Sequence, residues 1–118
     1  MLSPLPRTIP HAAMMAAARW GDAPALIERG ETWSFTHLWG ECRRAASALL
    51  ARGVGEGDRI AIWAPNSREW VVAAVGAMAC GATLVPLNTR LKGMEAGDIL
   101  RRTHARLLFT VGEFLGIA

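Results

Sequence analysis

Three polar residues stand just after short apolar runs that have the length of β-strands. Asn66 follows the run at 59–64, and both Asn88 and Arg90 follow the run at 83–87. An amide can donate or accept hydrogen bonds, and a guanidinium group binds phosphate or carboxylate oxygens. Because open α/β sheets bind ligands at the carboxyl ends of their strands, these residues are candidates for lining or supporting a site. The alternative stays open that Asn66 only turns the chain and Arg90 is solvated or anchors a loop.

Other patterns that could carry chemistry have a simpler structural interpretation. His11, His37 and His104 are far apart and lack the spacing of metal ligands, so we expect no metal site. The stretch at 53–57 has glycine at every second position, as some phosphate loops do. A dinucleotide loop follows a strand and opens a helix, whereas these glycines follow a helical pattern and lead into a strand. We therefore interpret them as a turn.

Basic residues are most frequent between positions 90 and 106. The whole chain has a net charge of +3, and 13 of its residues are Lys or Arg. Glu95 and Asp98 interrupt the basic region, and no series of aromatic residues accompanies it. This pattern is typical of a solvated helix face, so we expect no nucleic-acid partner.

The two cysteines, Cys42 and Cys80, fit neither a metal pair nor a redox pair because they are far apart in the sequence. Each falls on an apolar helix face. We expect both thiols to be reduced and largely buried.

The second half of the chain alternates strand and helix patterns. Short apolar runs at 59–64, 83–87 and 106–111 predict strands, and the segments at 67–80 and 95–104 predict helices. Parallel strands need a crossover of about a dozen residues, which these helices supply. The pattern predicts β-α-β-α-β with a parallel sheet, and right-handed crossovers would place the successive helices on one face.

The first half of the chain predicts a helix, a hairpin and a second helix. A helix from about 8 to 20 precedes β-prone pieces at 25–28 and 32–35, whose linking glycine suits a hairpin turn. Apolar residues then recur at three- and four-residue steps from 35 to 52, so one face of this helix packs on a sheet. Gly53 is placed to end this helix with a C-terminal cap in the left-handed backbone conformation. The fold class is therefore α/β.

The helix at 67–80 is unusual because it is apolar all round from Trp70 to Cys80. Such a helix is buried on several sides, and we expect its outer face to need packing partners that these 118 residues lack. Gly81 and Pro86 break the uncharged stretch at 70–87, which favours a helix, a turn and a strand over a membrane span. The N-terminal residues make a poor signal peptide. We therefore expect a cytoplasmic protein without a transmembrane segment.

A set of short motifs gives the chain a family resemblance. The residues that carry it are Asp22-Ala-Pro-Ala-Leu26, Ser34-Phe35, Gly53-Val-Gly-Glu-Gly-Asp-Arg-Ile-Ala-Ile-Trp-Ala-Pro-Asn-Ser67, Gly76-Ala77, Cys80-Gly-Ala82, Val85-Pro-Leu-Asn88 and Arg90-Leu91. With these motifs the chain resembles the N-terminal part of the acyl-CoA synthetases. They belong to the adenylate-forming superfamily of AMP-dependent synthetases and ligases.

The resemblance implies an enzyme that joins a carboxylic acid to CoA in two steps. ATP, Mg²⁺ and CoA would serve the whole enzyme, and a fatty acid is the default substrate, with aryl and alicyclic acids open. The family's catalytic motifs have no counterpart here, so no catalytic residue is expected in this segment. Residues 1–118 would be part of the N-terminal AMP-binding domain, with the remainder of that domain and a C-terminal domain absent.

Two other classes of function stay open. One is a non-catalytic α/β interaction module that keeps the sheet and lacks ligase activity. The other is an adenylation enzyme that loads a carrier protein instead of CoA. A homo-oligomeric assembly also stays open.

We predict that these 118 residues alone neither bind ATP appreciably nor form acyl-CoA. A nucleotide needs several donors around its phosphates, and the sequence offers only separate candidates at strand ends. Pyrophosphate release should be measured with ATP, Mg²⁺, CoA and fatty, aromatic and alicyclic acids. Turnover by the 118-residue chain would contradict the prediction.

Overall fold

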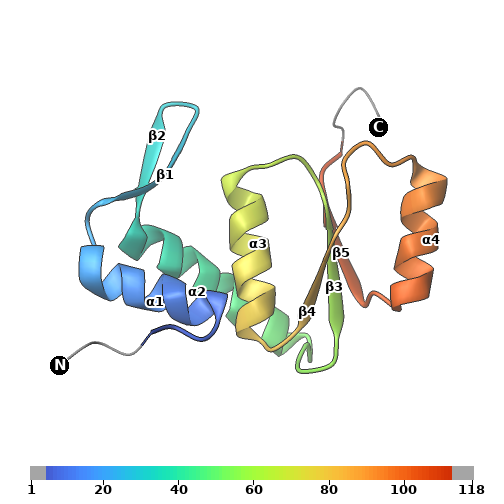
Figure 1. The fold of residues 1–118 in the computed structure, drawn as a ribbon, viewed down its shortest axis with the longest axis horizontal. Helices are drawn as coiled ribbons and strands as arrows, with labels where there is room; N and C mark the ends of the chain where they lie inside the picture. The colour runs from blue at the N-terminus through green and yellow to red at the C-terminus, as the bar shows by residue number, and fades with distance from the viewer. Residues whose placement is uncertain (1–4, 113–118) are drawn as a thin grey trace.

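The computed structural model describes residues 5–112, in which helices and strands follow the predicted order (Figure 1). In order these are α1 (Ile9–Trp20), β1 (Pro24–Glu28), β2 (Glu31–Ser34), α2 (Phe35–Ala51), β3 (Arg59–Trp63), α3 (Arg68–Ala79), β4 (Thr83–Pro86), α4 (Gly93–Thr103) and β5 (Leu107–Thr110). The α/β class and the hairpin followed by β-α-β-α-β are thus confirmed. The sequence also predicts the start of another connection at 112–118, of which only Gly112 is among the described residues.

Local sequence signals set most element ends. Thr8, Ser34 and Ser67 precede α1, α2 and α3, and each hydroxyl oxygen accepts the backbone N–H three residues further on. This is how N-caps satisfy N–H groups that have no partner within the helix. Helix α4 begins at Gly93, two residues earlier than predicted, because Glu95 accepts the backbone N–H of the residue before the helix.

Strands β1 and β2 form the predicted antiparallel hairpin. Arg29 and Gly30 make its turn, with φ of 51° and 77°. Positive φ at both positions suits the right-handed twist of a short hairpin, and the glycine adopts it without steric cost.

The second sheet is parallel, as predicted, with the strand order β4-β3-β5. Ile60 of β3 lies opposite Leu84 of β4 and Leu107 of β5. Ile60 and Ile62 are almost fully buried because β3 is the central strand and helices cover both of its faces.

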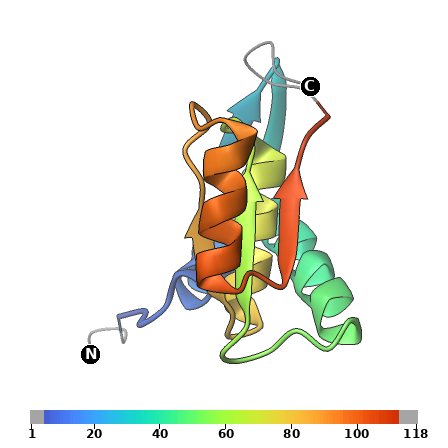
Figure 2. The ribbon, with the colours of Figure 1, turned by 90° about the vertical axis from the view of Figure 1, so that its right-hand side faces the viewer.

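The prediction that both crossover helices lie on one face is wrong. Helices α3 and α4 lie on opposite faces of the parallel sheet (Figures 1 and 2). Strand β4 lies on one side of β3, whereas β5 returns to the other side. Two right-handed crossovers that run in opposite directions across a sheet must use opposite faces.

The expectation that α3 lacks packing partners within this chain is also wrong. Helices α1 and α2 cover the side of α3 that faces away from the sheet (Figure 1). Residues 73–77 in the middle of α3 are therefore buried. The apolar sequence of α3 follows from its place between a helical layer and a sheet.

The uncharged stretch at 70–87 divides into α3 and β4, as the sequence predicts. Gly81, with φ of 82°, ends the helix between them. No helix within residues 5–112 is long and apolar enough to cross a bilayer.

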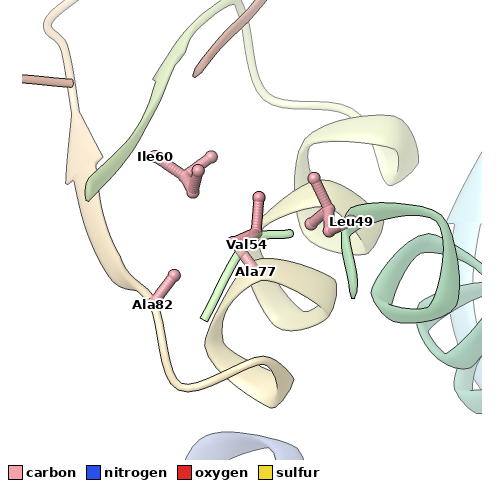
Figure 3. Close-up of a cluster of buried hydrophobic side chains, with 5 residues drawn as sticks. All are labelled: Leu49, Val54, Ile60, Ala77 and Ala82. Atoms are coloured by element: carbon pink, nitrogen blue, oxygen red, sulfur yellow. The ribbon is translucent and has the colours of Figure 1, made fainter. Parts of the chain in front are cut away.

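Helices α2 and α3 end in the same way, and both ends meet at β3 (Figure 3). In α2, Gly53 has φ of 81°, and Val54 donates its backbone N–H to the oxygen of Leu49. In α3, Ala82 donates to Ala77 in the same pattern. This Schellman motif brings an apolar residue after each helix against one in its last turn. The resulting cluster is completed by a residue of β3: Leu49, Val54, Ala77, Ala82 and Ile60.

Both cysteines are free thiols. Cys42 is fully buried, and the loss of solvation raises the pKa of its thiol to about 11. Cys80 is less buried than predicted because it lies at the C-cap of α3, where its Sγ is 3.3 Å from the carbonyl oxygen of Ala46. Burial also raises the pKa of the Cys80 thiol.

Helices α2 and α3 pack tightly against each other at Gly76. A Cβ atom at this position would lie 2.7 Å from the Cβ of Ala45 and 3.3 Å from the carbonyl oxygen of Cys42. Real Cβ contacts are not this short, so only glycine lets the two helices pack at this distance.

We predict that Gly76→Ala lowers the free energy of unfolding by about 1–3 kcal/mol, the usual cost of overpacking a core. Gly40→Ala in α2 is the matched control because, apart from its own chain neighbours and local helix backbone, no atom of the described residues lies within 4 Å of an added Cβ there. That control should be neutral or stabilising by up to about 1 kcal/mol, since alanine favours a helix interior over glycine. Denaturant titration of both variants checks this, and equal stability of the two would contradict it.

Candidate functional site

The loops after β3 and β4 separate at the carboxyl edge of the parallel sheet. The loop after β3 leads to α3 on one face, and the loop after β4 leads to α4 on the other (Figure 1). Because β3 and β4 are neighbours, the sheet has a topological switch point between them. Open α/β sheets bind ligands in the crevice that such a divergence creates. We define the loops 64–67 and 87–92 as the switch-point loops.

Asn88 and Arg90 lie together on the second of these loops. The indole Nε1–H of Trp63, at the end of β3, donates to the backbone oxygen of Asn88 at 3.1 Å. The side-chain oxygen of Asn88 accepts the backbone N–H of Arg90 at 2.9 Å. This bond forms a local turn. The side-chain oxygen of Asn88 is therefore engaged in shaping the loop.

The Arg90 side chain projects from this loop without an internal partner. It is exposed, and within residues 5–112 its guanidinium group forms no hydrogen bond or ion pair. A free guanidinium group at a switch point can bind an anionic group such as a phosphate or carboxylate.

Asn66 lies on the first switch-point loop and faces a different feature. It borders a cavity of about 400 Å³ between β1 and the first turns of α3, together with Ile27 and Trp70. Among the described residues, no hydrogen bond joins Asn66 to Asn88 or Arg90. The structure thus brings two of the three candidates onto one loop and places the third beside the hairpin.

An ionic cluster that the sequence analysis did not find ties the hairpin to α3. The backbone N–H of Arg68 donates to Glu28 Oε1 at 2.9 Å, and its guanidinium group contacts Glu31 Oε2 at 2.7 Å. That guanidinium group also lies over the ring of Trp33, 4.9 Å from its centre. Only a fifth of the Arg68 side chain is exposed. The sequence signal for this cluster was the pair of acidic residues beside the hairpin turn. Sequence reasoning missed it because Arg68 lies about 40 residues further along the chain.

Charge in this cluster shifts two pKa values. The hydrogen bond from Arg68, followed by its positive charge, lowers the pKa of Glu31 from its usual 4.5. The same hydrogen bond raises the pKa of Arg68. Both shifts favour the charged pair, because each partner stabilises the ionised form of the other.

A larger cavity of about 530 Å³ lies on the other side of α3. Apolar side chains from two helices and an edge strand form most of its surface: Ala45 and Ala48 of α2, Val72 and Ala73 of α3, and Leu107 and Phe109 of β5. Glu41, Glu69 and Arg52 add charges to it. We call this cavity the β5 groove. Neither Asn88 nor Arg90 borders it, so it is separate from the switch-point loops.

The described residues do not assemble a metal centre. No group of three or more His, Cys, Asp or Glu side chains in residues 5–112 could hold a metal ion. Arg90 offers one contact for an anion. The part of the chain that the structure describes therefore does not show the several converging donors that a triphosphate needs.

Comparison with known proteins places this sheet in an enzyme family. The model of the AMP-binding enzymes matches residues 14–117, so the chain belongs to this family. Within it are the adenylate-forming enzymes and acyl-CoA ligases that the sequence resembles.

Particular relatives and one solved structure agree with this assignment. Two relatives, from Rhodococcus jostii and Mycobacterium tuberculosis, are both named as 7a-methyl-1,5-dioxo-octahydro-1H-inden-4-yl propanoyl:CoA ligases. Each is 44% identical to this chain, over 94% and 93% of its length respectively. A structure of o-succinylbenzoate coenzyme A synthetase from Bacillus subtilis, in complex with ATP and magnesium ion, has 31% identity and a TM-score of 0.81. That alignment covers 86% of this chain and 28% of the other.

This chain corresponds to the N-terminal part of these proteins. It spans 22% of the length of each of the two relatives that are 44% identical to it. The described sheet and hairpin likewise match part of the N-terminal subdomain of adenylate-forming enzymes.

We predict that acid weakens the contact between the hairpin and α3 through Glu31. Its lowered pKa means that the stabilisation is fully present above the unfolded value of 4.5 and is lost as pH falls through the folded pKa. Hydrogen exchange of the hairpin amides should therefore speed up relative to the core in acid. In Glu31→Gln this additional pH dependence should disappear.

Glu56→Gln is the control, because Glu56 is exposed and forms no ion pair within the described residues. It should keep the acid dependence of the unaltered protein. An unchanged pH profile in Glu31→Gln would contradict the assigned role of the ionic cluster.

Proposed function

We propose that this chain is the N-terminal part of the AMP-binding domain of an ATP-dependent acid–CoA ligase. The observation that carries the proposal is 44% identity to two CoA ligases along more than nine tenths of the chain. The remainder of that domain and a C-terminal domain would follow in the longer protein. A cytoplasmic location remains part of this proposal.

The proposed reaction has two steps. A carboxylate oxygen of the acid attacks the α-phosphorus of ATP, and the bond to the bridging oxygen breaks to release pyrophosphate. The sulfur of CoA then attacks the acyl carbon, AMP leaves with the electrons of the carbon–oxygen bond, and the thiol proton passes to solvent. The first step converts a poor leaving oxygen into part of a phosphate leaving group. Mg²⁺ would offset the phosphate charge when bound.

We infer that the switch-point loops contribute positioning and charge rather than catalytic groups. Trp63 and Asn88 hold the loop that carries Arg90, whose guanidinium group has no hydrogen-bond or ion-pair partner among residues 5–112. In this proposal Arg90 attracts an anionic group of a substrate, and Asn66 supports the neighbouring loop. Catalytic groups would come from the polypeptide beyond residue 118.

The proposed acid is a propanoate attached to a fused bicyclic ring system. Support comes from the two 44% identical relatives, whose names both specify such an acid. Fatty acids, the default class from the sequence, are the second class that the experiment must test.

The test is acid-dependent pyrophosphate release by the longer protein with ATP, Mg²⁺ and CoA. The bicyclic propanoate, a long-chain fatty acid and an aromatic acid should be compared with a reaction that lacks acid. We expect release and a matching acyl-CoA product with the bicyclic acid. Release only with a fatty acid would overturn the substrate class, and release without CoA consumption would favour transfer to a carrier protein. No acid-dependent release would overturn the proposed function.

For Arg90→Ala in the longer protein we predict a fall in kcat/KM of about 10-fold. Loss of one charge-assisted hydrogen bond of about 1.4 kcal/mol corresponds to this factor. The melting temperature should not change, because the Arg90 side chain has no hydrogen bond or ion pair to lose within residues 5–112. Arg101→Ala is the control, since Arg101 is also exposed and, within residues 5–112, its side chain pairs only with Asp98 at the surface. Equal kinetics of the two variants would contradict a role for Arg90.

A further inference from the structure

We infer that Trp63 and Thr110 are positioning residues for the proposed reaction, because they hold in place the turn that carries Arg90. Their hydrogen bonds join the carboxyl ends of β5, β3 and β4, and we call these bonds the strand-end network. This inference rests on the proposed function, in which Arg90 attracts an anionic group of a substrate.

The turn that carries Arg90 is closed by its own hydrogen bonds. The backbone oxygen of Asn88 accepts the N–H of Leu91 at 3.1 Å, and its side-chain oxygen accepts the N–H of Arg90 at 2.9 Å. The preceding residue, Leu87, is buried and donates its backbone N–H to Ile62 of β3 at 2.9 Å. The turn is therefore a compact unit, and its place in the site depends on how it is attached to β3.

Trp63 adds a side-chain attachment between this turn and β3. Successive side chains of a strand point to opposite faces of the sheet, and Ile62 packs with residues of α3 on one face. Trp63 therefore lies on the other face, which α4 covers and to which the loop 87–92 leads (Figures 1 and 2). From there its indole Nε1–H donates to the backbone oxygen of Asn88. The bond thus holds the residue that closes the turn.

Thr110 extends the network to the third strand. It lies opposite Trp63 in the parallel register of β5 and β3, and its hydroxyl donates to the backbone oxygen of Trp63 at 2.6 Å. This bond holds the last residue of β3 beside the end of β5. Both the backbone and the indole N–H of Trp63 are therefore fixed by hydrogen bonds. Groups from three strands together determine the position of one turn.

The position of its backbone matters for Arg90 because a long side chain loses conformational freedom when it binds. Arg90 is exposed, and its guanidinium group has no hydrogen-bond or ion-pair partner among residues 5–112. A fixed backbone limits the volume that this group can sample, and reaction rates are sensitive to small errors in the position of binding groups. Loss of the Trp63 bond should therefore weaken the contribution of Arg90 to the reaction.

The test combines Trp63→Phe with Arg90→Ala in the longer protein. Phenylalanine keeps an aromatic ring on β3 but has no N–H to donate. Trp63→Phe should lower kcat/KM by about 5-fold, the effect of one neutral hydrogen bond, and by no more than Arg90→Ala does. In the Arg90→Ala background it should cause no further loss, because a residue that acts through another has no effect once the other is removed. Additive losses in the double variant would overturn the inference.

Trp20→Phe is the matched control for the loss of an indole. Trp20 of α1 is half-exposed, and within residues 5–112 its indole N–H forms no hydrogen bond. Trp20→Phe should leave kcat/KM unchanged. An equal loss in Trp20→Phe and Trp63→Phe would overturn the role of the Trp63 bond.

Thr110 offers a second pair of variants that leaves Trp63 intact. Thr110→Val keeps the shape of the side chain without its hydroxyl, whereas Thr110→Ser keeps the hydroxyl. We expect Thr110→Val to lower kcat/KM by about 2- to 5-fold and Thr110→Ser to retain the activity of the unaltered protein. Equal kinetics of the two variants would overturn the role of Thr110.

Hydrogen exchange tests the network without a measurement of activity. The amides of Arg90 and Leu91 should exchange at least about 10-fold faster in Trp63→Phe than in the unaltered longer protein. The amides of β3 should keep their exchange rates, which separates a loosened turn from a general loss of stability. Unchanged exchange at Arg90 and Leu91, or equal acceleration throughout β3, would overturn the inference. Pyrophosphate release by the unaltered longer protein tests the proposed function independently of these results.

Discussion

The close packing of α2 on α3 at Gly76 is the constraint on which the rest of the structure depends. A side chain there would meet Ala45 of α2, so glycine sets the distance between the helices. Helix α3 can therefore lie between a helical layer and the parallel sheet, which explains its apolar sequence. Because α3 also connects β3 to β4, its position fixes where these strands end and where the switch-point loops begin.

Contacts made by Arg106, at the amino end of β5, hold β5 next to the end of α2. Arg106, just before β5, donates to the carbonyl oxygens at the end of α2 and pairs with Asp58. The hydrogen bond from the N–H of Gly55, and then Arg106, lowers the pKa of the Asp58 carboxyl, which favours its ionised form. Since these groups join α2 to the edge strand, they also define the two sides of the β5 groove.

The arrangement separates three regions around the sheet. The switch-point loops lie at the carboxyl ends of the strands, the Arg68 cluster joins the hairpin to α3, and the β5 groove lies between α2 and the edge strand. Only the first of these has the position that open α/β sheets use for ligands. The Arg68 cluster joins elements within this chain, and the β5 groove is a mostly apolar cavity at the edge of the sheet.

The sequence alone determined which elements form, in what order, and that strands β3, β4 and β5 are parallel. These features depend on residues close in the sequence, such as the Ser67 cap and the glycine that ends α3, or on the length of a crossover. It also identified the strand-end candidates, although not their separation into two groups. Only the tertiary structure decided that β5 lies beside β3, which places α4 on the opposite face from α3. The tertiary structure likewise decided that α1 and α2 pack over α3 and that Arg68 pairs with the hairpin. Strand order and contacts between elements depend on which surfaces, distant in the sequence, pack together. A pattern of neighbouring residues carries no information about that choice.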